Sequence, residues 1–135
     1  MNNVSINDDN FKNSEAYQNY LKENPRTGTL KIRAYAASQA VPIAGLNVIV
    51  SKVIDNLKVV FFEGATNASG VIDNITLPAP ILNTNNLDIP EKATYDIEAI
   101  YTPDNFDLFY KVNIYENFPV VQNINIVPTL KVGGF

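Results

Sequence analysis

Short segments in which apolar and polar side chains alternate run through most of this chain, and they constrain its fold more than any other feature. Within Thr29–Ala36, Leu30, Ile32 and Ala34 alternate with polar or aromatic residues. A period of two places such residues on opposite faces of a strand, so the pattern predicts a half-buried strand. Six further strands are predicted: Leu46–Ile54, Leu57–Phe62, the strand within Thr66–Leu77, Tyr95–Thr102, Phe106–Tyr115 and Pro119–Val127. Of these, Leu57–Phe62 does not alternate, because its run Val59–Phe62 is apolar throughout and is expected to be buried on both sides. Seven short strands at this spacing are typical of an all-β, antiparallel β-sandwich.

The stretch Thr66–Pro80 shows how these strands are punctuated. Asn67–Gly70 has the composition of a tight turn, and Gly70 can adopt the positive φ that such a turn requires. Pro78 and Pro80 have no backbone N–H and therefore end the strand that follows the turn. The sequence thus predicts a turn, one strand and an abrupt exit.

An N-terminal arm, residues 1–27, precedes the predicted sandwich, residues 28–135. Within the arm, the sequence predicts one short helix over Ser14–Glu23. Ser14 is a favourable N-cap, Glu15 suits the first turn, and Asn24 followed by Pro25 ends the helix.

Tyr17, Tyr20 and Leu21 share one face of the predicted helix. A helix of about three turns is not stable alone, so this face must pack on an apolar surface. Two alternatives are open: the helix packs on its own sandwich, or it docks on a neighbouring subunit. We take these three residues as the candidate interface of the arm.

Composition excludes several classes of function. The chain has 135 residues, enough for one domain with a proper core, and a formal net charge of −4. Its Lys and Arg residues are scattered singly, which argues against a nucleic-acid partner. The N-terminus lacks a signal-peptide pattern, and no apolar run is long enough to span a bilayer. We therefore expect synthesis in the cytoplasm without a signal peptide and no membrane insertion.

The sequence contains neither histidine nor cysteine. Zinc sites with nitrogen or sulfur ligands, Cys–His pairs and Ser–His–Asp triads are thereby removed. Asp104, Asn105 and Asp107 could offer oxygen ligands to Ca²⁺, but their spacing does not match an EF-hand loop. Asp8 and Asp9 are weaker candidates for calcium ligands. We expect no metal, no cofactor and no catalytic residues.

Two carboxylates could in principle flank a glycosidic bond. Asp96 and Glu98 lie on the same face of one predicted strand, at a separation that such chemistry uses. Outward-facing acids on a half-exposed strand usually serve solvation, and we interpret this pair in that way.

Three aromatic residues fall opposite the aliphatic faces of their strands: Tyr35, Phe109 and Tyr115. Exposed aromatic rings can stack on sugars or build a protein interface, although the chain has no tryptophan, the favoured stacking residue. They are candidate residues for glycan binding or for an interface.

The open edges of a sandwich are a further candidate for association. Strand edges present unpaired backbone groups, which proteins either protect or use for pairing. The arm is long enough to reach an adjacent subunit. These features favour a homo-oligomer assembled through the arm or through sheet edges.

Several motifs together resemble the carboxypeptidase regulatory-like, or transthyretin-like (prealbumin-like), sandwich. They are Gly28–Ile32, Ala40–Val48, Thr66–Leu77 and Tyr95–Ala99, and the resemblance covers roughly residues 28–130. The LPAP motif, the ATYDIEAIY strand and the VNIYENFPVVQNINIVP ending look more narrowly like modules of spore-forming clostridia. Those modules accompany spore cortex-lytic and other peptidoglycan-associated proteins.

The resemblance implies a structural, self-assembling module at the spore surface or cell envelope. Its alternative implication is an accessory module that binds peptidoglycan or another carbohydrate, or that positions a peptidoglycan hydrolase. The enzymatic branch of the fold, 5-hydroxyisourate hydrolase, uses histidines and a characteristic C-terminal tetrapeptide. This chain has neither, so the resemblance does not imply that activity here. The family's glycine-tyrosine pair after the Ala99 strand is replaced by Tyr101–Asn105, which predicts a different turn.

Overall fold

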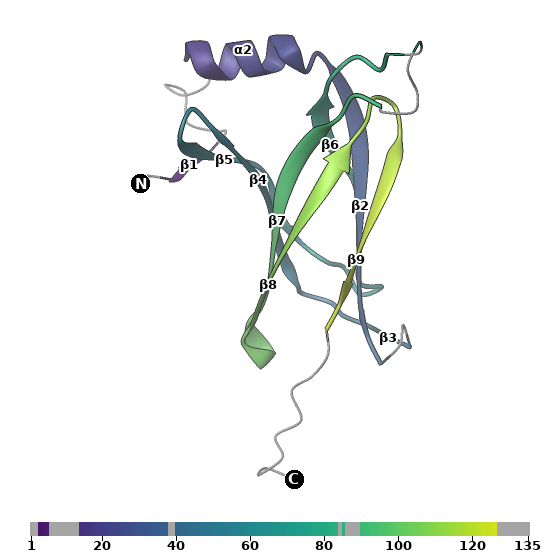
Figure 1. The fold of residues 1–135 in the computed structure, drawn as a ribbon. Coiled ribbons are helices and arrows are strands. Elements are labelled where there is room, and N and C mark those ends of the chain that lie inside the picture. The colour runs from purple at the N-terminus through teal and green to yellow at the C-terminus, as the bar shows by residue number, and fades with distance from the viewer. Residues whose placement is uncertain (1–2, 6–13, 38–39, 84, 86–89, 127–135) are drawn as a thin grey trace.

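Two β-sheets pack face to face, and one helix lies across an end of the sandwich (Figure 1). The structure is a computed structural model, and it describes residues 3–5, 14–37, 40–83, 85 and 90–126. The elements in chain order are β1 (Asn3–Ser5), α2 (Glu15–Glu23), β2 (Arg26–Ala36), β3 (Val41–Pro42), β4 (Asn47–Ile54), β5 (Leu57–Ala65), β6 (Val71–Ala79), β7 (Ala93–Tyr101), η1 (Thr102–Asp104), β8 (Phe106–Ile114) and β9 (Pro119–Asn125). The predicted sandwich with one short N-terminal helix is confirmed.

All seven predicted strands are present, as β2 and β4 to β9. Two short strands, β1 and β3, were not predicted. β2 begins at Arg26, two residues inside the segment that we assigned to the arm. The end of the last predicted strand at Val127, the tail Lys131–Phe135, and Asp8 and Asp9 lie outside the described residues.

Sheet A has the strand order β1-β5-β4-β7-β8. In sheet B, β2 pairs with β6 and β3 along one side and with β9 along the other. The structure departs from the predicted antiparallel arrangement at two pairings, because β9 runs parallel to β2 and β1 runs parallel to β5. β8 and β9 belong to different sheets, so the turn between them crosses the sandwich instead of forming a hairpin. The Asn117 N–H donates to the Thr27 carbonyl at 2.8 Å, which places the turn on β2.

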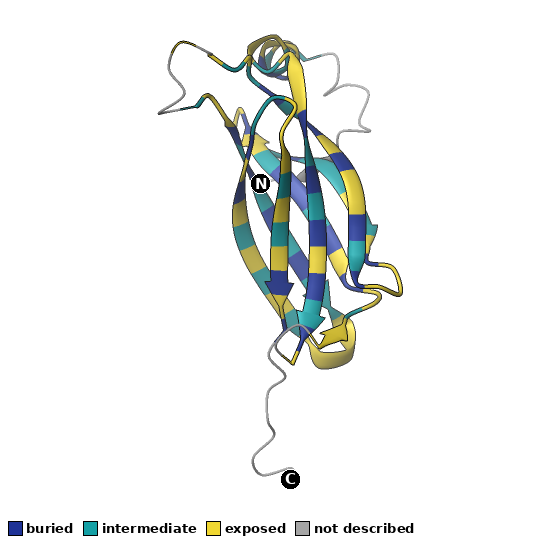
Figure 2. Ribbon diagram, turned by 90° about the vertical axis from the view of Figure 1, so that its right-hand side faces the viewer, coloured by how far each residue is buried: buried dark blue, intermediate teal, exposed yellow. Residues whose placement is uncertain are grey.

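The core consists of the apolar faces of both sheets, and the strands show alternating bands of buried and exposed residues (Figure 2). β7 follows the predicted alternation closely, with Tyr95, Ile97 and Ala99 fully buried. β5, whose run Val59–Phe62 we expected to be buried on both sides, contains a bulge opposite Val50 and Ser51. The extra residue at this bulge lets the consecutive side chains Phe61 and Phe62 both pack against the core.

The turn before β6 forms as predicted. The Asn67 side chain accepts hydrogen bonds from the backbone N–H groups of Ser69 and Val71, and Gly70 has a φ of +75°. The Gly70 carbonyl accepts a hydrogen bond from the Ala34 N–H at 2.7 Å, which ties the turn to β2. A Cβ atom on Gly70 would lie 2.4 Å from the Ala34 carbonyl oxygen, so a larger residue does not fit.

Gly70→Ala should therefore destabilise the fold more than Gly45→Ala does. Both glycines have positive φ, but a Cβ on Gly45 would meet no atom within 4 Å. We expect about 1–2 kcal/mol of backbone strain in each variant, and about 1–3 kcal/mol more from overpacking at Gly70. Urea unfolding of the two variants measures the difference. Equal losses would show that the close approach to Ala34 carries no cost.

Candidate binding surfaces

Helix α2 packs on its own sandwich, which is the first of the two alternatives that the sequence left open. Ser14 is the N-cap and accepts a hydrogen bond from the Tyr17 N–H at 3.2 Å, as predicted. Tyr17 and Tyr20 are each 8% exposed, whereas Leu21 is half-buried. Within this chain the predicted docking face is therefore already covered, because its two tyrosines complete the core at the end of the sandwich.

An aromatic cluster of four rings holds the helix in place. The Phe61 ring centroid lies 6.5 Å from Tyr17, 5.9 Å from Tyr20 and 5.3 Å from Tyr95. The Tyr20 hydroxyl donates to the Tyr95 hydroxyl at 2.8 Å, and the Tyr95 hydroxyl donates to the Pro78 carbonyl at 2.6 Å. This chain of hydrogen bonds joins the helix to both sheets.

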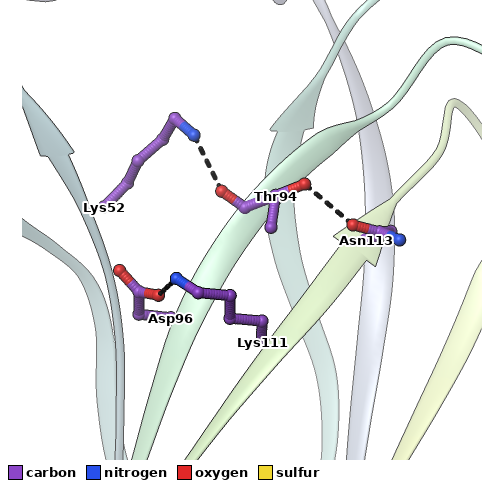
Figure 3. Close-up of polar contacts among 5 residues, drawn as sticks. All are labelled: Lys52, Thr94, Asp96, Lys111 and Asn113. Carbon is purple, nitrogen blue, oxygen red and sulfur yellow. Dashed lines mark hydrogen bonds and ion pairs between the residues drawn. The ribbon is translucent and has the colours of Figure 1, made fainter.

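A lysine lies beside the same rings. The Lys52 Nζ atom donates to the Thr94 carbonyl at 2.8 Å (Figure 3). It also lies 5.9 Å from the Tyr20 ring centroid and 5.8 Å from the Tyr95 ring centroid. These distances fit cation–π contacts. Burial raises the pKa of both tyrosine hydroxyls above the ordinary value, so the folded protein favours their neutral forms.

The three candidate aromatics lie in three separate places, so they do not form one platform. Tyr35 is half-buried on β2, next to β3 and β9. Phe109 is on β8 and is 71% exposed. Tyr115 follows β8 and meets Phe118 edge to face at 6.2 Å, lining a cavity of about 410 Å³ with Leu82, Pro90 and Glu116.

The outer surface of sheet A carries the most ordered array of polar groups. We name it the Phe109 face and define it by Thr94, Asp96 and Glu98 on β7 with Phe109, Lys111 and Asn113 on β8. In the register of the two strands, Glu98 lies opposite Phe109, Asp96 opposite Lys111, and Thr94 opposite Asn113. Directly opposed residues of an antiparallel pair point to the same side, so all six side chains share one surface.

Specific contacts hold this array. Lys111 Nζ donates to Asp96 Oδ1 at 2.6 Å, and Thr94 Oγ1 donates to Asn113 Oδ1 at 2.8 Å (Figure 3). Lys58 Nζ lies 3.9 Å from Glu98 Oε1. Partial burial and the nearby carboxyl of Asp107 raise the pKa of Glu98, and Lys58 opposes this rise.

The acids that we considered for catalysis or calcium binding therefore have other partners or lie apart. Asp96 is bound to Lys111, and Glu98 lies between Lys58 and Asp107. Asp104 and Asn105 are exposed in the turn after β7, where Asn105 adopts a left-handed conformation. Among the described residues, no group of three or more acids forms a candidate metal site. In the same part of the chain, no helix is long and apolar enough to cross a membrane.

The edge of sheet B is a second surface, which the sequence alone did not single out. Among the described residues, β9 pairs only with β2. Its seven residues, PVVQNIN, contain no charged side chain, and Val121 is 49% exposed. The missing charge was visible in the sequence, but the position of β9 at an edge follows only from the crossing turn before it.

Comparison with known proteins defines the fold class. The chain has a transthyretin-like fold, the class that contains the 5-hydroxyisourate hydrolases. The structure of 5-hydroxyisourate hydrolase from Klebsiella pneumoniae matches 76% of this chain and 92% of its own, with a TM-score of 0.50 and 18% identity. The crystal structure of (S)-allantoin synthase matches 78% of this chain but only 42% of its own, with a TM-score of 0.50 and 10% identity. No family model and no curated protein sequence matches the chain. At these identities, the likeness establishes the fold alone.

The aromatic cluster predicts how stability depends on pH. The folded state holds Tyr20 and Tyr95 neutral, whereas the unfolded chain ionises its tyrosines near pH 10. The unfolded state therefore binds fewer protons above that pH, so the stabilisation is fully present below about pH 10 and is lost as the pH rises further. Urea unfolding at about pH 9 and about pH 11 should show a fall in the free energy of unfolding.

Tyr20→Phe is the matched variant for this measurement. It keeps the ring on Phe61 but removes one titrating hydroxyl and its hydrogen bond, at a cost of about 0.5–1.5 kcal/mol at neutral pH. The fall between the two pH values should be smaller in this variant. An identical fall would mean that Tyr20 does not contribute to the alkaline transition.

Proposed function

We propose that this chain is a non-catalytic structural module that self-associates through the edge of β9 that faces away from β2. The observation that carries this proposal is the composition of that edge. Natural sheets protect exposed edge strands with charges, prolines, bulges or a covering segment. Among the described residues, β9 has one of these devices, Pro119 at its first residue, and the exposed apolar side chains Phe118 and Val121 accompany it.

Backbone direction identifies the groups that would pair. The Ile126 N–H donates to the Tyr35 carbonyl, and the Phe118 carbonyl accepts from the Thr29 N–H, so even-numbered residues direct their backbone groups toward β2. Successive residues of a strand direct these groups to opposite edges. Val121, Asn123 and Asn125 therefore direct their N–H and C=O groups away from β2.

A second copy of β9 fits this edge well. In an antiparallel pair centred on Asn123, Val121 would lie opposite Asn125 of the second copy, and Asn123 opposite its own equivalent. Each of these positions offers both a donor and an acceptor, so the ladder closes without an unpaired group at its centre. Neither strand brings a charge that would oppose the pairing.

Other surfaces support association less well. The described parts of the arm are used within the chain, because β1 pairs with β5 and α2 packs on the aromatic cluster. β8, the edge of sheet A, carries the charged residues Asp107 and Lys111. Pro78 weakens pairing on β6, the other edge of sheet B. Of the two routes predicted from the sequence, the sheet edge is therefore the one that we propose.

The non-catalytic part of the proposal rests on the sequence and on the pairing of its acids. The chain has no imidazole or thiol to serve as a base or nucleophile at neutral pH. The paired acids of the Phe109 face are engaged with lysines.

The proposed setting is the spore surface or cell envelope of a spore-forming bacterium. Its support is the resemblance of the LPAP motif and of the ending VNIYENFPVVQNINIVP to modules of peptidoglycan-associated clostridial proteins. The alternative proposal is an accessory module that binds peptidoglycan or another glycan, or that positions a peptidoglycan hydrolase. The exposed ring of Phe109 favours this alternative.

Asn123→Pro tests the proposed edge. Proline at this position removes a backbone N–H that points away from β2, so the β2–β9 hydrogen bonds remain. We expect the full-length wild-type chain to form dimers or larger assemblies in sedimentation velocity experiments. The proline variant should sediment as a monomer.

Asn123→Thr is the control, because it changes the same side chain but keeps the N–H group. It should assemble as the wild type does. A monomeric wild-type chain, or a proline variant that assembles like the wild type, would overturn pairing through β9.

A further inference from the structure

We propose that the Phe109 face is a binding site for a neutral saccharide, separate from the β9 edge through which we propose assembly. The proposal gives the alternative, carbohydrate-binding function a defined location. Phe109 has the largest exposed fraction, 71%, among the exposed large apolar side chains of the described residues. An aromatic ring held in the open on a rigid strand is available for stacking.

The surface beside this ring is hollowed on two sides. One hollow of about 200 Å³ is lined by Ser51, Val53, Lys58, Asp96, Glu98 and Phe109. The second, of about 290 Å³, is lined by Asp96, Ile97, Phe109, Tyr110 and Lys111. Both are smaller than the roughly 300–1,000 Å³ of sites for drug-sized ligands, so each suits a small unit such as one sugar ring. Because Phe109 and Asp96 line both hollows, one ligand with two linked units can occupy them together.

The polar groups around the ring match hydroxyl groups in kind. Carboxylate oxygens of Asp96 and Glu98 accept hydrogen bonds, and the ammonium groups of Lys58 and Lys111 donate them. Neighbouring sugar hydroxyls both donate and accept, so an acid–lysine pair can bind two of them at once. The apolar face of the same sugar ring can then lie on Phe109.

Charge pairing favours a neutral ligand. Asp96 is bound to Lys111 at 2.6 Å and Glu98 lies near Lys58 at 3.9 Å, so each acid has a cation beside it. The carboxylates of Asp96, Glu98 and Asp107 would repel a polyanion, and the two lysines would repel a polycation. A neutral polyol carries no charge, so neither the acids nor the lysines repel it.

A protein partner fits this surface less well. The centres of protein interfaces are depleted of charged residues and enriched in apolar ones. Here the centre is a ladder of ion pairs, and Phe109 and Val53 are the large apolar side chains of this surface that are exposed by more than half. An aromatic ring surrounded by hydrogen-bonding side chains is a better match to a sugar.

Calorimetric titration of the full-length protein with chitohexaose and with cellohexaose tests the site. We expect at least one of these hexasaccharides to bind, and the amide NMR signals of β7 and β8 to shift. Phe109→Ala should weaken binding on the order of tenfold, the loss expected for one aromatic stacking contact. The fold should persist, because this ring is exposed.

Phe118→Ala is the matched control, since Phe118 is also exposed, at 56%, but lies beside the separate Tyr115 cavity. It should bind like the wild type, as should Asn123→Pro, which separates this site from the proposed assembly. The proposal is overturned if neither hexasaccharide binds at millimolar concentrations, if Phe109→Ala binds as the wild type does, or if Phe118→Ala loses as much affinity as Phe109→Ala.

Discussion

The pairing of β2 with strands on both of its sides is the interaction on which the rest of this structure depends. β2 is the longest strand, and it pairs with β6 and β3 on one side and with β9 on the other. Its inward side chains Leu30, Ile32 and Ala34 form the centre of the core on sheet B. The chain has no disulfide, so this sheet is held by backbone pairing and by the apolar area that it buries.

The two surfaces that we propose for function follow from how β2 and β7 are placed. Because β9 returns to β2 from the opposite sheet, it is an edge strand among the described residues, and its outer backbone groups are the ones that we propose to pair with another chain. Because β7 is central in sheet A, its outward acids are fixed opposite the outward side chains of β8. One strand pair thus sets a backbone surface for assembly, and the other sets a side-chain surface for a ligand.

Much of the fold could be predicted because alternation is a local signal. The positions of Tyr95, Ile97 and Ala99, the turn at Asn67–Gly70 and the Ser14 cap each depend on neighbouring residues. The direction of β9 follows instead from its pairing with β2, which is about 90 residues away in the sequence, and no local pattern indicates it. The bulge at Phe61 was hidden for a similar reason, because register is a property of two strands. The sequence also could not show that Tyr35, Phe109 and Tyr115 lie in separate places, because their relative positions depend on how the strands are arranged in the two sheets.

The parallel pairing of β2 with β9 also has a consequence for the order in which the chain can fold. The paired residues Thr29 and Pro119 are about 90 residues apart, so sheet B lacks β9 until the ribosome has made the chain past Asn125. Forming contacts between residues so far apart in sequence is slow, so the backbone groups of β2 that face β9 stay unpaired during synthesis. During this time, the unpaired side of β2 could pair with the β9 strand of another nascent copy nearby. The local concentration of nascent chains would then affect the fraction of molecules in which β2 pairs with the β9 strand of the same chain.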